Sequence, residues 1–199
     1  MTNQVFVYGS MTEGMIHYGK IQAAVASSQR GQACGAAYKL KVGYPVLVRE
    51  GSSLIPGQVI ELRSPDFMLA LLDEFYGCSA LEPLKGLHTR ELSHIKLGSG
   101  ERLEAWVYYL NPNKLPATAV RIETHEWEEA LRAPKFSDQL SERQVTYIKK
   151  LGAVTGREVI PIDLPLYREL MNLELIVDKG RRLALSKFGQ EVYKYLGES

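Results

Sequence analysis

The stretch FVYGSMTEG, residues 6–14, decides the fold of the N-terminal part of the chain. Its apolar start is typical of a β-strand, and Gly9 and Ser10 then turn the chain toward a new element. Such a turn leaves backbone N–H groups unpaired, and these groups bind carboxylates or oxyanions. The stretch therefore predicts a strand followed by an anion-binding turn. A plain corner, with Tyr8 in the core and Ser10 as a helix N-cap, is the alternative.

Short strand-like runs recur through the first 115 or so residues, separated by Gly, Pro and Ser. They are residues 4–9, 35–40, 45–50, 55–62, 89–97 and 102–110. Two helical patterns lie among them, at residues 15–27 and 65–75. Ser64 and Pro65 have the sequence of an N-cap followed by the first helical residue. We expect an α+β fold in which helices pack on a sheet or barrel.

The chain of 199 residues suits one domain with a small appendage. Residues 116–140 are more polar, with a short helix expected at residues 125–132 and a domain edge at residues 134–140. We therefore predict a domain at 1–135 and a C-terminal, mainly helical extension at 140–199.

The extension has the order helix, helix, small hairpin, helix, with Ser141 as a helix cap and Lys179-Gly180 at the hairpin tip. This order is found in part of a winged-helix module, and we expect at least a helical piece that packs on the main domain or on a partner subunit. Self-association or a protein partner through residues 140–199 is thus an expectation.

Composition argues against several classes of partner. The 24 Lys and Arg residues balance 23 Asp and Glu residues, so no overall field attracts nucleic acid or a lipid surface. Cys34 and Cys78 are too few for a disulfide scaffold and are expected to be buried free thiols in a reducing compartment. No basic leader or long apolar run occurs at the start. We expect a cytoplasmic protein that contacts no membrane and no nucleic acid.

Five stretches, taken in order, resemble the γ-glutamylcyclotransferase-like proteins, the group with AIG2-like and BtrG-like members. They are VYGSMTEG (7–14), YPVLVREGSSLIPGQVIEL (44–62), LLDEFYG (71–77), AWVYYL (105–110) and ETHEWEEAL (123–131). The resemblance covers about residues 4–130 and leaves the last 60 or so outside. It implies a small mixed β-barrel-like sheet with flanking helices and a cavity at its mouth.

The resemblance also implies a chemistry. In the family's enzymes the YGS loop holds a γ-glutamyl group, and a glutamate takes a proton from the α-amine as that amine attacks the γ-carbonyl. 5-Oxoproline forms and an amine leaves, with no metal and no cofactor. The substrate-binding positions that the resemblance implies are Tyr8, Gly9, Ser10, Met11, Arg90 and Tyr108.

The sequence departs from the family at the glutamate, because LLDEFYG places Tyr76 there. A phenol, with an ordinary pKa of about 10, donates a hydrogen bond at neutral pH and does not collect a proton. Glu74 would share the face of Tyr76 if this segment were extended, and Glu82 would reach the site if its loop folded back. Tyr76, Glu74 and Glu82 are therefore the candidate catalytic residues, while Asp73 is expected to orient or cap.

A second departure follows, where His88-Thr89-Arg90 replaces the family's Y.R pattern. Arg90 is expected to hold a carboxylate or to support the loop, and His88 to be a structural strand residue. Tyr108 and Tyr109 alternate along a strand, so one of them is expected to face the interior.

Two functions follow as hypotheses. The first is a transferase-family protein with a degenerate active site, which binds a γ-glutamyl or related anionic, amino-acid-derived small molecule and whose cyclisation chemistry is impaired. The second is a non-catalytic ligand-binding or scaffold protein that signals through its C-terminal helices.

Overall fold

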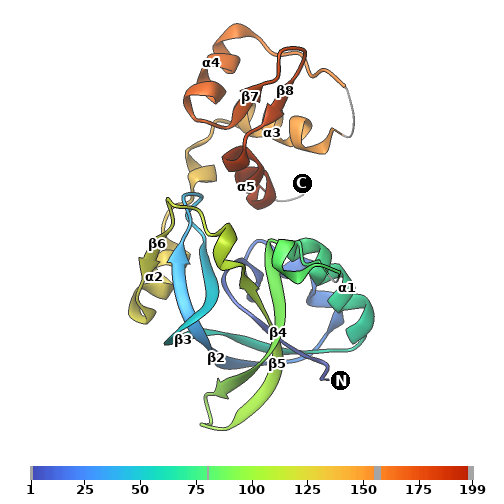
Figure 1. The fold of residues 1–199 in the computed structure, drawn as a ribbon, viewed down its shortest axis with the longest axis vertical. Coiled ribbons are helices and arrows are strands. Elements are labelled where there is room, and N and C mark those ends of the chain that lie inside the picture. The colour runs from blue at the N-terminus through green and yellow to red at the C-terminus, as the bar shows by residue number, and fades with distance from the viewer. Residues whose placement is uncertain (1, 80, 155–157, 197–199) are drawn as a thin grey trace. The chain divides into compact units, whose positions relative to one another are not determined.

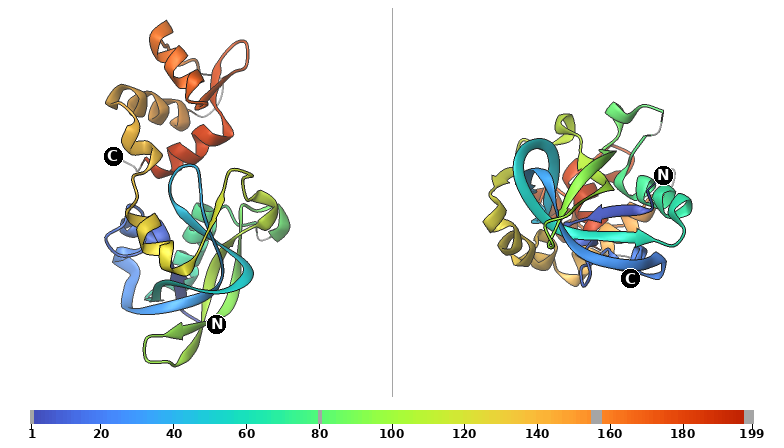
Figure 2. Two further views of the ribbon diagram at one scale, coloured as in Figure 1. Left: turned by 90° about the vertical axis from the view of Figure 1, so that its left-hand side faces the viewer. Right: turned by 90° about the horizontal axis from the view of Figure 1, so that it is seen from below.

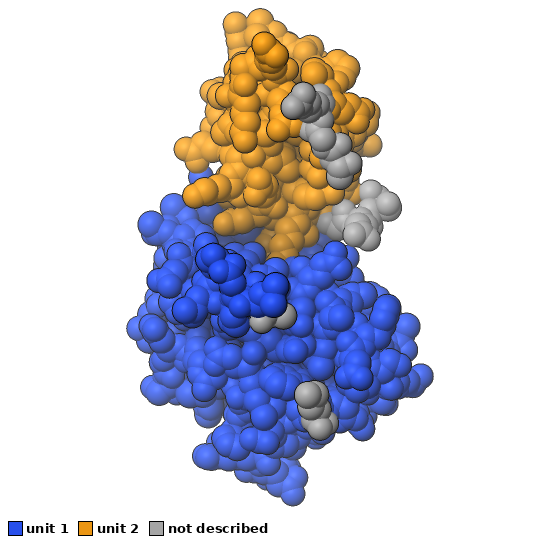
Figure 3. Space-filling view, turned by 45° about the vertical axis from the view of Figure 1, so that its right-hand side comes forward, with its two compact units in different colours: residues 1–133 blue, residues 134–199 orange. Residues whose placement is uncertain are grey.

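The computed structural model describes residues 2–79, 81–154 and 158–196. The chain divides into two compact units, Met1–Ala133 and Pro134–Ser199, which are coloured separately in Figure 3. Each unit is described by itself below.

Figure 1 shows the order of the elements along the chain. The strands are β1 (Gln4–Val7), β2 (Val25–Lys39), β3 (Pro45–Leu62), β4 (His88–Leu97), β5 (Arg102–Leu110), β6 (Val120–Ile122), β7 (Ile176–Asp178) and β8 (Leu183–Leu185). The α-helices are α1 (Pro65–Tyr76), α2 (Trp127–Arg132), α3 (Glu142–Ala153), α4 (Leu164–Asn172) and α5 (Lys187–Tyr195).

The first unit is a closed barrel of five strands. The strands follow the order β3-β1-β5-β4-β2, and β2 pairs again with β3 to close the ring. The pairing of β1 with β5 is parallel, and the other pairs are antiparallel. Strand β6 adds to the edge of β2, and helices α1 and α2 lie on opposite sides of the barrel (Figures 1 and 2). The expected α+β fold with a barrel-like sheet and a helical C-terminal part is confirmed.

The alternation of side chains along β1 explains why both of its faces are covered. Phe6 and Tyr8 point into the apolar cluster of the barrel interior, which also contains Trp127. Val5 and Val7 point to the other face and pack with residues of α1. Because both faces are buried, the strand is a run of apolar residues.

Helix α1 begins as its sequence predicts, with Ser64 at the N-cap and Pro65 in the first turn. It ends at Tyr76, and Gly77 follows in the left-handed conformation with φ of 64°. The amide of Gly77 donates to the carbonyls of Asp73 and Glu74, which closes the last turn. Asp73 and Tyr76 therefore both lie in the last turn of the helix.

The helix expected at residues 15–27 is wrong. Two short 3-10 helices, Tyr18–Lys20 and Gln22–Ala24, occupy its first part, and β2 begins at Val25. Strand pairing explains the difference, because residues 25–30 pair in sequence with residues 58–62 of β3. Residues 45–50 and 55–62 likewise form one long strand, since β2 pairs along almost its whole length.

The second unit has the expected order of helix, helix, hairpin and helix. The side chain of Ser141 accepts a hydrogen bond from the Gln144 amide and caps α3, at 3.3 Å. Strands β7 and β8 form the hairpin, and Gly180 at its tip has φ of 81°. Ser186 caps α5 by accepting from the Gly189 amide at 2.8 Å. The Ser141 cap is the one that the sequence predicted.

The cysteines differ in part from expectation. Neither Cys34 nor Cys78 forms a disulfide, but Cys34 is exposed and Cys78 is half-buried, so their expected burial is wrong. Cys34 lies on β2, and its thiol donates to the carbonyl of Gly51. No helix in residues 2–79, 81–154 and 158–196 has the length and apolar character needed to cross a membrane.

Candidate functional site

The turn after β1 is built around a left-handed glycine. Gly9 has φ of 59° and starts a 3-10 helix, Gly9–Met11, while the side chain of Met11 is fully buried. Thr12 closes the turn, since its amide and its hydroxyl both donate to the Gly9 carbonyl, at 3.3 and 2.8 Å. Among the turn, loop and cap hydrogen bonds of the described residues, none is donated by the amide of Gly9 or Ser10. The anion-binding role of these two amides stays a prediction.

Ser10 is held by a buried histidine. The Oγ atom of Ser10 lies 3.0 Å from Nδ1 of His17, and the His17 amide donates to the Ser10 carbonyl at 2.9 Å. His17 is 2% exposed, and its ring meets Phe75 of α1 edge-on at 4.8 Å. The loop is thus tied to the last turn of α1 through an aromatic contact.

Tyr76, which the resemblance matches to the family's glutamate, is packed. Its side chain is 8% exposed, and its ring stacks on Tyr108 of β5 with centroids 4.3 Å apart. Nδ1–H of His88 donates to the Tyr76 carbonyl at 2.7 Å, and His88 is itself buried. The structural role expected for His88 fits this geometry. Met11, Tyr76 and Tyr108 belong to one apolar cluster between the barrel and α1.

A polar network surrounds the hydroxyl of Tyr108. This hydroxyl donates to Oδ1 of Asp73 at 2.8 Å, and Oδ2 of Asp73 pairs with the Arg90 guanidinium at 2.9 Å. The Arg90 guanidinium also lies over the ring of Trp106, 5.0 Å from its centroid. Burial, and then the hydrogen bond to Asp73, raise the pKa of Tyr108 well above its usual range. Asp73 orients its neighbours, as the sequence suggested.

The two strand tyrosines point to opposite faces of β5, so one of them faces the barrel interior, as expected, and both are buried. Tyr109 lies in the cluster of the barrel interior, while Tyr108 lies in the cluster under α1. Helix α1 covers the second face of β5, so alternation did not expose either ring. Tyr8 belongs with this arrangement, because its hydroxyl donates to the backbone carbonyl of Tyr108 at 2.6 Å.

The two acidic residues considered as replacements for the glutamate lie elsewhere. Glu74 is exposed, because α1 continues through Tyr76 and residues two apart on a helix do not share a face. Glu74 was expected to share the face of Tyr76 only if this segment were extended, and the segment is helical. Glu82 is also exposed and pairs with Lys85 in its own loop at 2.5 Å. The structure thus brings together Tyr8, Met11, Tyr76, Arg90 and Tyr108, and it leaves Glu74 and Glu82 at the surface.

A hollow of about 670 Å³ lies on the barrel beside the residues that follow the turn. It is lined by Thr12, Glu13, Met15, Arg30, Gly31, Gln32, Pro56, Gly57, Gln58, Gly98, Trp127, Glu128, Leu131 and Arg132. The substrate-binding positions implied by the resemblance are not among these residues. Sequence reasoning missed the hollow because its lining comes from segments far apart in the chain. The strand register, which the sequence does not give, places Arg30 opposite Gln58.

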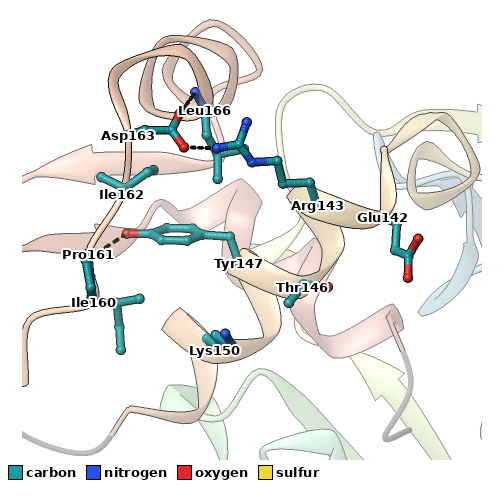
Figure 4. Close-up of a pocket in the computed structure, with 10 residues that line it drawn as sticks. All are labelled: Glu142, Arg143, Thr146, Tyr147, Lys150, Ile160, Pro161, Ile162, Asp163 and Leu166. Atoms are coloured by element: carbon teal, nitrogen blue, oxygen red, sulfur yellow. Dashed lines mark hydrogen bonds and ion pairs between the residues drawn. The ribbon is translucent and has the colours of Figure 1, made fainter.

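The second unit has its own groove, of about 770 Å³, between α3, residues 160–163 and the start of α4. The ring of Tyr147 spans this groove and its hydroxyl donates to the Ile160 carbonyl at 3.2 Å (Figure 4). Arg143 and Asp163 form an ion pair at the rim. These contacts hold residues 160–163 against α3, and the groove is lined by both apolar and charged side chains.

Several solved structures are similar to this chain. The structure is similar to that of At3g28950.1 from Arabidopsis thaliana, at 23% identity and a TM-score of 0.50, over 82% of this chain and 94% of that one. At5g39720.1 from the same plant gives 20% identity and a TM-score of 0.48, over 64% and 80%. YkqA from Bacillus subtilis gives 18% and 0.47, over 65% of this chain, which spans 40% of YkqA.

No curated protein matches the chain. The family model described as "Gamma-glutamyl cyclotransferase, AIG2-like" matches residues 5–129, which include the turn after β1, α1 and the strands of the barrel. The chain therefore belongs to the γ-glutamyl cyclotransferase, AIG2-like family.

Proposed function

We propose that this protein binds a γ-glutamyl or related anionic, amino-acid-derived small molecule at the turn after β1 and does not cyclise it efficiently. Two features support the binding step. Gly9 and Ser10 keep backbone amides that no turn or cap bond uses, and Ser10 is positioned by His17. Amides of this kind are suited to a carboxylate or to the oxyanion of an attacked carbonyl.

The observation that carries the proposal is the side chain at position 76. Cyclisation requires a base that takes a proton from the α-amine, since only a neutral amine attacks a carbonyl. The ring of Tyr76 is stacked on Tyr108. Its phenol is protonated at neutral pH, so it cannot act as the base that a carboxylate would provide. The loss of a general base typically reduces the rate about 10²- to 10⁴-fold.

Asp73 is a poor substitute for the missing base. One of its carboxylate oxygens accepts from Tyr108 and the other pairs with Arg90. Both oxygens are therefore already engaged by neighbouring side chains, and neither points freely toward an amine. A carboxylate with a structural role of this kind positions its neighbours and leaves the chemistry without a base.

The substitution Tyr76→Glu tests this proposal, with Tyr76→Gln as the control of similar size and no charge. We expect Tyr76→Glu to release 5-oxoproline from γ-glutamyl amines, while the natural chain and Tyr76→Gln release about 10²- to 10⁴-fold less. Burial raises the pKa of a carboxyl group, so a glutamate here would be poised to take a proton near neutral pH. A folded Tyr76→Glu protein that forms no 5-oxoproline would contradict the proposal.

Binding is tested separately by calorimetry with a γ-glutamyl amine. Gly9→Ala and Gly14→Ala make a matched pair, because both glycines have positive φ, 59° and 82°. A Cβ at Gly9 would lie 3.3 Å from the Pro45 carbonyl, whereas nothing lies within 4 Å of a Cβ at Gly14. We expect Gly9→Ala to weaken binding at least about tenfold, and Gly14→Ala to leave it nearly unchanged. Equal affinities of the two variants would contradict a ligand at the turn.

A further inference from the structure

The hollow on the barrel contains two opposite charges that do not neutralise each other. Arg30 of β2 and Glu13 of the turn both line it. Neither side chain has a hydrogen-bond or ion-pair partner within the described parts of the chain, residues 2–79, 81–154 and 158–196. The other two charges of the lining, Arg132 and Glu128, pair with each other at 3.0 Å. The hollow therefore offers one positive and one negative group to a guest.

Gln58 places these two groups next to one another. Arg30 is the cross-strand partner of Gln58 in the pairing of β2 with β3. The amide of Glu13 donates to Oε1 of the same Gln58 side chain at 2.9 Å. Residues that face each other across an antiparallel pair have their Cβ atoms about 5 Å apart. Both charged residues are thus anchored to one point of the sheet, yet their side chains do not form an ion pair.

The rest of the lining combines neutral donors and apolar surface. Gln32 lies two residues from Arg30 on the same face of β2, where it can donate from its amide. Met15, Pro56 and Leu131 supply apolar side chains, all of them half-buried. A volume of about 670 Å³ lies within the usual range of small-molecule pockets, roughly 300–1,000 Å³. The hollow is therefore large enough for an amino acid with its side chain.

We propose that this hollow is a binding site for a small zwitterion of the α-amino-acid type with an apolar side chain. Arg30 binds its carboxylate, and Glu13 accepts hydrogen bonds from its ammonium group. The side chain of the ligand packs against Met15, Pro56 and Leu131. None of Gly9, Ser10, Tyr76, Arg90 and Tyr108 lines the hollow, so the site is separate from the proposed cyclotransferase position.

Calorimetry with three related probes tests the site on the full chain. L-Phenylalanine carries both charges, 3-phenylpropionate lacks the amine, and 2-phenylethylamine lacks the carboxylate. We expect L-phenylalanine to bind at least about tenfold more tightly than either of the others, since each charge-assisted contact contributes roughly 1.5–3 kcal/mol. Equal affinities of the three probes, or no heat from L-phenylalanine, would overturn the proposal.

Two variants assign the charges, and a third serves as the control. Arg30→Gln is expected to weaken the binding of L-phenylalanine and of 3-phenylpropionate at least about tenfold, and to leave the binding of 2-phenylethylamine unchanged. Glu13→Gln is expected to weaken the binding of L-phenylalanine and of 2-phenylethylamine, and to leave the binding of 3-phenylpropionate unchanged. Arg102→Gln removes an exposed strand arginine outside the hollow and should change nothing. If Arg30→Gln binds every probe like the natural chain, the inference is wrong.

The two proposals fail in different ways. The zwitterion site is measured as binding to the natural chain, and its result does not depend on whether Tyr76→Glu forms 5-oxoproline. A chain that binds L-phenylalanine through Arg30 and gains no activity from Tyr76→Glu would retain this inference and contradict the proposed function.

Discussion

The ring of Tyr76 stacks on the ring of Tyr108, with centroids 4.3 Å apart and an angle of 13° between the planes. One ring comes from the last turn of α1 and the other from β5, so the stack joins the helix to the barrel. The side chain that the sequence resemblance matches to the family's base is therefore part of the hydrophobic core in this chain. We expect this ring to contribute to the stability of the first unit.

The first prediction concerns that contribution. Truncating Tyr76 to Ala is expected to lower the free energy of unfolding by about 3–5 kcal/mol, as large buried aromatic residues do when a cavity replaces them. Tyr76→Phe keeps the ring and is expected to lose less than about 1.5 kcal/mol. Guanidinium chloride unfolding measures both. Equal losses in the two variants would show that the stack is not what stabilises this position.

The second prediction concerns the hydrogen bond from Tyr108 to Asp73. In a double-mutant cycle of Tyr108→Phe and Asp73→Asn, we expect a coupling energy of about 1–2 kcal/mol, because the bond is buried and involves a charged acceptor. Additive losses would contradict this bond. Arg90→Gln measured in the same background reports the ion pair, and its cost should be smaller since both side chains keep some contact with solvent.

The third prediction is a pH dependence. Burial raises the pKa of Tyr108 above its ordinary value of 10.0, so the unfolded chain releases the phenolic proton at a lower pH than the folded chain does. The contribution of Tyr108 to the free energy of unfolding is thus present in full below pH 10. It is lost as the pH rises from 10 toward the pKa of Tyr108 in the folded chain. The expected slope is up to about 1.4 kcal/mol for each pH unit.

Tyr108→Phe should remove this part of the slope between pH 9 and 11, as read by denaturant unfolding. Burial also raises the pKa of Tyr109 and of Tyr147, so a residual slope of the same sign is expected in the variant. A Tyr108→Phe protein with an unchanged slope would show that this phenol does not titrate as described.

The fourth prediction concerns the second unit. A Cβ at Gly189 of α5 would lie 2.0 Å from the Leu175 carbonyl, which the backbone cannot accommodate. Gly189→Ala is therefore expected to destabilise residues 142–195 by several kcal/mol, or roughly 3 or more. Gly180→Ala is the control, since its φ of 81° costs only about 1–2 kcal/mol and no atom lies within 4 Å. Hydrogen exchange resolved along the chain compares them.

Local sequence signals predicted much of the fold. Short strand-like runs separated by Gly, Pro and Ser marked most of the barrel strands, and Ser64-Pro65 marked the start of α1. The helix expected at residues 15–27 was wrong because local propensity contains no information on the pairing partner. Residues 58–62 of β3 pair with Val25 and its neighbours, which therefore form a strand. Long-range pairing also joined residues 45–50 and 55–62 across Gly51, where φ is 121°.

The site was only partly predictable for the same reason. The family motifs placed the turn and Tyr76, which lie in continuous stretches of sequence. The role of Asp73 as an acceptor for Tyr108 and Arg90 required the packing of α1 on β4 and β5. The pair of Arg30 and Glu13 required both the register of β2 with β3 and the path of the turn, neither of which has a sequence signature.

The most direct test of the central claim is the rate at which the natural chain and Tyr76→Glu release 5-oxoproline from γ-glutamyl amines in one assay. Our account predicts a kcat/KM for the natural chain about 10²- to 10⁴-fold below that of Tyr76→Glu. A natural chain that matches or exceeds the variant would mean that another group supplies the base, and would contradict the loss of catalysis.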